Sequence, residues 1–150
     1  MSGQSGALAV ALLLSLTLAG DAAAETVAQT ARKWGLIGPW SQDCSLKPDR
    51  DKGTVFDFEI AGDERVLQRR GFGDTSDESE VVSAEASSDG LLNLLVFFPR
   101  LKQTRAYGLR MQPDGTMRTM YNRNQKQEYT IRDGKYVAEG SPTPSLRKCR

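Results

Sequence analysis

The two cysteines, Cys44 and Cys149, constrain the fold of this chain more than any other feature. Cys44 belongs to the stretch that opens the first expected strand, and Cys149 is the second-last residue. Two cysteines in an exported protein usually pair, and here only one connectivity exists. A bond between them would fasten both ends of the domain together, which predicts a closed or nearly closed antiparallel β structure. The alternative is a pair of free, buried thiols.

Residues 1–24 are typical of a secretory signal peptide. The apolar run Ala7–Gly20 is too short to cross a bilayer comfortably, since crossing takes about 20 residues. Ala22-Ala23-Ala24 supplies the small residues that a signal peptidase reads, so we expect cleavage after Ala24. The sequence therefore predicts a periplasmic protein with a single domain at residues 25–150. The alternative is an N-terminal membrane anchor.

The rest of the chain alternates between apolar and polar residues with the period of a β-strand. Phe56, Phe58 and Ile60 share one face of a strand, and turns such as Asp133-Gly134 separate the runs. A short helix is expected before them at residues 25–36. The pattern predicts an all-β fold, an antiparallel meander of about eight strands closed into a small barrel, with a β-sandwich as the alternative. The expected strands are 54–60, 65–72, 80–87, 91–98, 104–111, 116–123, 127–132 and 135–139, and 146–149 should meet the first strand.

The run Leu91–Phe98 is apolar on both faces. Such a strand is either covered on its second face or exposed there as a binding patch. The outer residues would be Leu91, Leu95 and Phe97. One face of the expected helix could supply the cover.

Charge is unevenly distributed along the chain. Residues 25–90 contain 8 Lys+Arg against 14 Asp+Glu, whereas residues 91–150 contain 12 against 4. This asymmetry can mark an anionic partner, for example an anionic lipid surface. The alternative, which the pattern favours, is that acidic and basic strands face each other across the fold.

A resemblance to the lipocalins, or to the broader calycins, rests on Gly38-Pro39-Trp40 after a short helix, followed by a meander and a C-terminal cysteine. The resemblance implies a lipocalin-like barrel whose floor Trp40 closes, with Arg147 or Lys148 packed across the indole. The Thr-Asp-Tyr element of typical lipocalins is absent. The sequence is also similar to small exported bacterial proteins with a Trp…Asp-Cys opening, and to small periplasmic protease inhibitors.

Little in the sequence supports catalysis. The chain has no histidine, which excludes Ser-His-Asp and Cys-His devices. The carboxylates from Asp74 to Glu80 are interpreted as a solvated loop. We therefore expect a protein that is not an enzyme, with no cofactor, no metal and no nucleic-acid partner.

Six aromatic residues are candidates to line a ligand cavity, with filling of the core as the alternative. Two function classes follow. The first is a non-catalytic periplasmic binding protein for a small apolar or amphipathic ligand held in the barrel. The second is an envelope interaction or structural protein, or a protease inhibitor with a free segment at Glu25–Trp34, acting through its outer surface. The candidate lining residues are Trp40, Phe56, Phe58, Tyr107, Tyr121 and Tyr129.

Overall fold

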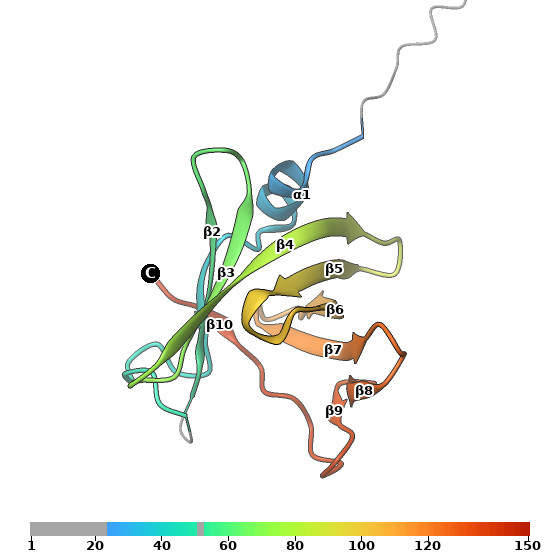
Figure 1. Cartoon of the computed structure of the whole chain (residues 1–150). Coiled ribbons are helices and arrows are strands. Elements are labelled where there is room, and N and C mark those ends of the chain that lie inside the picture. Colours follow the sequence, from blue (N-terminus) through green and yellow to red (C-terminus); the bar gives the residue numbers. More distant parts are fainter. Residues whose placement is uncertain (1–23, 51–52) are drawn as a thin grey trace, which may run out of the picture.

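Ten antiparallel strands form one continuous, curled sheet in the computed structural model, which describes residues 24–50 and 53–150 (Figure 1). The strands follow chain order from β1 to β9, and β10 returns to pair with β1. The predicted all-β, barrel-like fold is confirmed. The predicted signal peptide lies outside the described residues apart from Ala24. The elements, in chain order, are α1 (Val27–Trp34), β1 (Gly38–Ser41), β2 (Val55–Ile60), β3 (Val66–Gly71), β4 (Ser76–Ala86), β5 (Leu91–Phe98), the 3-10 turn η1 (Pro99–Leu101), β6 (Gln103–Met111), β7 (Met117–Asn124), β8 (Tyr129–Arg132), β9 (Lys135–Tyr136) and β10 (Arg147–Lys148).

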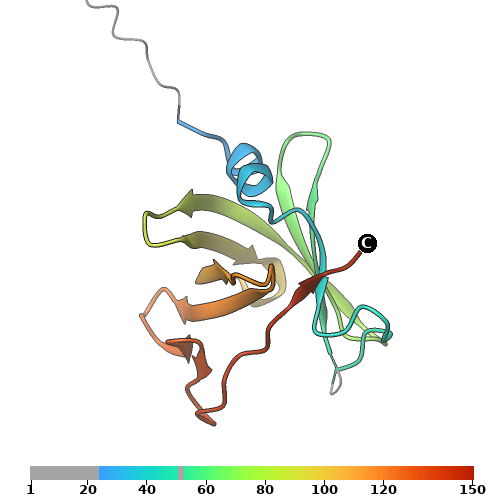
Figure 2. The same cartoon turned by 180° about the vertical axis from the view of Figure 1, so that it is seen from behind.

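The C-terminal segment forms the seam of the curled sheet. Leu146 exchanges two backbone hydrogen bonds of 2.8 Å with Met117 of β7. The next two residues, in β10, pair with Ser41 and Trp40 of β1, and β10 lies beside β1 in both side views (Figures 1 and 2). Four consecutive residues therefore join β7, β1 and the disulfide.

Cys44 and Cys149 form the predicted disulfide. Their Cα atoms lie 5.4 Å apart across a sequence separation of 105 residues. The bond fastens the end of the chain directly beyond β10, so it holds the seam closed. A disulfide in this position is consistent with an oxidising compartment.

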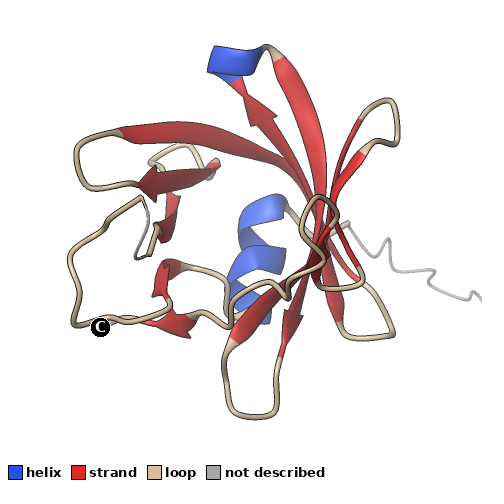
Figure 3. Cartoon of the chain, turned by 90° about the horizontal axis from the view of Figure 1, so that it is seen from below, coloured by secondary structure: helices blue, strands red, loops and turns tan. Residues whose placement is uncertain are grey.

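Helix α1 covers one opening of the curled sheet. Thr26 accepts a hydrogen bond from the backbone N–H of Gln29, whose side chain accepts one from Thr26 in return, so a capping box begins the helix. Gly35 ends it in the left-handed conformation. Ala28 and Ala31 are buried in the core, and Figure 3 shows α1 within the outline of the strands. The helix therefore packs against the interior and does not cover the outer face of β5.

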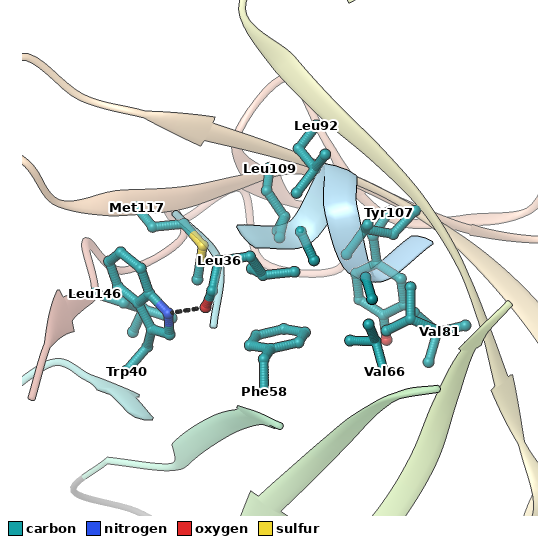
Figure 4. Packing of buried hydrophobic residues seen from close by; sticks show 14 of the residues in the cluster. Leu36, Trp40, Phe58, Val66, Val81, Leu92, Tyr107, Leu109, Met117 and Leu146 are labelled. Carbon is teal, nitrogen blue, oxygen red and sulfur yellow. Dashed lines mark hydrogen bonds between the residues drawn. The ribbon is translucent and has the colours of Figure 1, made fainter. Parts of the chain in front are cut away.

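Apolar side chains from α1 and most of the strands meet beneath the helix (Figure 4). The indole of Trp40 is fully buried, and its Nε1 donates a 2.8 Å hydrogen bond to the carbonyl of Leu36. Phe58 lies beside them, and burying a side chain of this size contributes about 1.5–3 kcal/mol. This cluster is the hydrophobic core.

The Gly38-Pro39-Trp40 motif has a packing reason in this fold. Gly38 has a φ of +119°, and a Cβ there would lie 3.0 Å from the side chain of Lys148. The Lys148 ammonium lies 5.5 Å from the Trp40 ring centroid and donates to the carbonyl of Gly35. Lys148, and not Arg147, is thus the basic residue packed across the tryptophan.

Register shifts at bulges change which residues point inward. In β7 the register shifts by one residue, so that Leu109 pairs with Thr119 but Gly108 pairs with Tyr121. Simple alternation in the expected strand 116–123 predicts one common face for Met117, Thr119 and Tyr121. This prediction is wrong, because the extra residue reverses the alternation before Tyr121. A second shift separates the faces of Tyr129 and Ile131 in β8.

Candidate functional site

The interior has a closed half and an open half. The closed half, beneath α1, is the hydrophobic core. In the open half, toward the other ends of the same strands, charged and polar side chains replace the apolar ones. There the strands enclose a cavity of 370 Å³, which we call the Arg70 cavity. Its walls are formed by Gln42, Arg50, Gly53, Thr54, Phe56, Arg70, Tyr107, Thr119, Asn122, Thr130, Ile131, Tyr136, Thr143, Pro144 and Leu146.

Ordinary strand alternation brings Arg70 and Asp77 into the interior. Val66 and Gln68 point inward from β3, so Arg70 does too. On β4, Asp77 lies directly opposite Arg70 in the antiparallel register. The predicted solvated loop at residues 73–78 is therefore wrong from Ser76 onward, because β4 begins there.

Arg70 and Asp77 form a half-buried, bidentate ion pair. Arg70 Nε donates a 2.8 Å hydrogen bond to Asp77 Oδ1, and Nη2 donates to Oδ2. The guanidinium also lies 5.0 Å from the ring centroid of Phe98 and 5.5 Å from that of Phe72. Aromatic faces attract a cation, and the bidentate pair fixes its plane. Arg70 is thus held in one orientation at the cavity wall.

Two buried polar atoms beside this pair lack hydrogen-bond partners within the described part of the chain. They are Gln68 Oε1 and Ser79 Oγ, on residues only 3% and 2% exposed. Gln68 and Ser79 lie opposite each other, two register positions from Arg70 and Asp77 and on the same face of the sheet. An unpaired buried polar group costs about 1–3 kcal/mol, so this position favours a polar guest. Ser79 and Arg70 also line a second hollow, of 380 Å³, that adjoins the first.

Tyr107, on β6, adds a further polar group to the wall of the Arg70 cavity. Burial raises the pKa of its hydroxyl, and the nearby Arg70 guanidinium offsets only part of that effect. Arg105 Nε donates a 2.6 Å hydrogen bond to the Asn122 side chain, and its Nη2 donates one of 3.2 Å to Thr130. The open half therefore offers a phenol that stays neutral, an amide and fixed guanidinium groups.

The six predicted aromatic residues fall into three groups. Trp40 and Phe58 fill the closed half. Phe56 and Tyr107 line the Arg70 cavity. The other two lie on the outer face, where the Tyr121 ring covers Gly108 and its hydroxyl donates to Asn93, while Arg123 stacks between the rings of Tyr121 and Tyr129.

The acidic and basic segments of the chain form no close ion pair with each other within the described residues. The ion pairs found among the described residues all join partners within residues 25–90, for example Arg69 with Glu59 and with Glu78. The favoured interpretation, that acidic and basic strands face each other, stays a prediction. The acidic segment is paired mainly by its own arginines, and, after the hydrogen bond from Ser87, the Arg110 guanidinium helps to lower the pKa of Asp89 across the two segments.

In the described residues, no group of three or more histidine, cysteine, aspartate or glutamate side chains could hold a metal ion. Within the same part of the chain, no helix has the length and apolarity needed to cross a membrane.

No family model, curated protein or solved structure matches this chain. The functional argument therefore rests on the Arg70 cavity and the outer surface.

Proposed function

We propose that the protein is a non-catalytic binding protein for a small amphipathic ligand, held in the Arg70 cavity with an anionic group against Arg70. The observation that carries the proposal is the fixed, half-buried guanidinium of Arg70 in a cavity wall that also carries apolar side chains. The sequence alone leaves an apolar ligand open as well. The polar wall favours an amphipathic one.

The cavity offers a surface for each end of such a ligand. Phe56, Ile131 and Leu146 supply apolar contacts along the wall. Arg70 and Asn122 supply polar contacts on the same cavity. A volume of 370 Å³ lies at the small end of the range for ligand sites, about 300–1,000 Å³, so it suits a short chain or a single ring system.

A protease inhibitor that uses a free N-terminal segment is less well supported. Residues 27–34 form α1, whose Ala28 and Ala31 are buried in the core. Entry of this segment into another protein would remove the cover of the core.

The test compares two probes that differ only in the headgroup, decanoate and decanol, by isothermal titration calorimetry. We expect the protein to bind decanoate more tightly, because a charge-assisted bond to arginine contributes about 1.5–3 kcal/mol, or roughly tenfold or more in affinity. Native mass spectrometry of protein purified from periplasm would show which ligand comes with it.

Neighbouring arginines give a matched pair of variants. Arg70→Met should remove the preference for decanoate. Arg69→Met should preserve it, because Arg69 points outward to Glu59 and Glu78. Failure of both probes to bind, or an equal loss in both variants, would contradict the proposal.

A further inference from the structure

The outer face of β5 and the η1 turn that follows it expose a row of apolar side chains. Leu95 and Phe97 are 42% and 38% exposed, and Leu101 in η1 is 59% exposed. Helix α1 packs on the interior, so it leaves these residues uncovered. We call Leu95, Phe97 and Leu101 the apolar row. In Figure 3, η1 is the short blue turn at the outer edge of the molecule, projecting beyond the sheet.

Positive charge lies at the η1 end of the apolar row and on its β6–β7 side, whereas on the β4 side Glu80, ion-paired with Arg65, lies opposite Phe97. Arg100 and Lys102 flank Leu101 in the sequence, and neither forms an ion pair within the described residues. Arg123 lies two strands away from Leu95 on the same face of the sheet, because Leu95 pairs with Ala106 and Ala106 pairs with Arg123. A shallow hollow of 290 Å³ lies between Leu95 and Arg123.

The next hairpin adds to this charge. In an antiparallel meander every second turn lies at the same end of the sheet, so the β7–β8 turn shares an end with η1. The β7–β8 turn carries Lys126, which is exposed. The nearby Glu128 is hydrogen-bonded to Asn124. Cations thus outnumber anions around the row.

We propose that the apolar row and its flanking cations dock the protein on the surface of an anionic phospholipid bilayer. Leu101 would enter the boundary between headgroups and acyl chains, with Arg100 and Lys102 at the level of the phosphates. A projecting turn with basic, apolar and basic residues in succession fits a deformable, negatively charged layer. The hollow beside Arg123 would lie at headgroup depth. This inference does not depend on the Arg70 cavity.

The test is co-sedimentation of the purified protein with vesicles. We expect binding to vesicles of phosphatidylglycerol and phosphatidylcholine in equal parts, little binding to pure phosphatidylcholine, and release as the salt concentration rises. Leu101→Asp should lower the partition coefficient about tenfold or more, because it places an anion among the lipid phosphates. The Arg100→Gln/Lys102→Gln double variant should lower it by a similar factor.

Leu46→Asp is the matched control, because Leu46 is also about half exposed, at 50%, but lies outside the row. It should bind vesicles like the wild type. Circular dichroism should show that all variants are folded. Equal binding to both kinds of vesicle, an equal loss with Leu46→Asp, or a wild-type dimer that Leu101→Asp converts to monomers would overturn the proposal.

Discussion

The closed and open halves of the interior are built from the same strands but differ in what their inward residues do. On β3, Val66 is packed in the core, while Arg70, four residues later on the same face, lines a cavity. On β4, Val81 is likewise packed in the core, while Asp77, on the same face, lines the second hollow. One half of the sheet therefore serves mainly stability, and the other half is available for binding.

The contrast shows how a small sheet can keep a cavity without a long chain. Apolar side chains fill space to the density of an organic crystal, so the closed half leaves no room. The ion pair of Arg70 and Asp77 requires a fixed geometry and partial hydration, so side chains cannot collapse around it. A few inward polar residues at one end are enough to keep that end open.

The largest expected difference between the halves concerns two phenylalanines on the same face of β2. Phe58→Ala should lower the free energy of unfolding by about 3–5 kcal/mol, because its ring is fully buried in the closed half. Phe56→Ala should cost clearly less, since Phe56 is only partly buried at the cavity. Urea unfolding followed by fluorescence measures both. Equal losses would mean that the open half is as tightly packed as the closed one.

Removal of the disulfide tests the seam that encloses both halves. The Cys44→Ser/Cys149→Ser variant should lose about 2–4 kcal/mol of stability, because the bond closes a long loop in the unfolded chain. Thermal unfolding measures the loss, and wild-type protein in reductant is the control. An unchanged midpoint in both would show that backbone pairing alone holds the seam.

The ion pair of the open half should be replaceable as a unit. Asp77→Leu should cost about 1–2 kcal/mol, because it leaves the Arg70 guanidinium half-buried without its partner. The Arg70→Met/Asp77→Leu double variant should lie within about 1 kcal/mol of the wild type. Denaturant unfolding of the single and double variants measures the coupling. A double variant that is less stable than Asp77→Leu would mean that the pair supports the fold itself.

The smallest expected effect is on the outer face of β2. Burial, and then the neighbouring Glu59, raise the pKa of Asp57 above its usual value. The folded protein therefore binds more protons than the unfolded chain between the two pKa values, so stability falls as the pH rises through that window. Asp57→Asn should add less than about 0.5 kcal/mol near pH 7 and nothing in acid, where Asp57 is protonated in both states. A gain that is the same at every pH would rule out this cause.

Much of the fold could be predicted from local pattern. Alternation gave the inward faces of β2 and β5 correctly, and the Asp133-Gly134 pair does connect two strands. These features depend on neighbouring residues, which the sequence shows directly. The cysteine pairing followed from the limited number of partners.

The candidate site was harder to predict because it depends on cross-strand partners. A bulge in β7 decides that Tyr121 lies outside, and no residue type marks the position of that bulge. Val137 lies within the expected strand 135–139 but is exposed, because β9 ends at Tyr136. Asp77 belongs to a polar run whose neighbours are solvated, and only its register against Arg70 places it inside. One sequence signal could have located Arg70. Val66 and Gln68 point inward from β3, and Arg70 is the next residue on the same face.

The seam depends on residues that follow β1 to β9 in the chain, and this order has a consequence for folding. Leu146, the two residues of β10 and Cys149 come after β1 to β9 in the chain, yet they join β7 to β1. A chain that stops before Leu146 would contain nearly every strand and still have no means of locking the first strand to the last. Formation of the Cys44–Cys149 disulfide thus marks molecules in which the seam has closed, and a thiol-reactive label on Cys44 would report those in which it is still open.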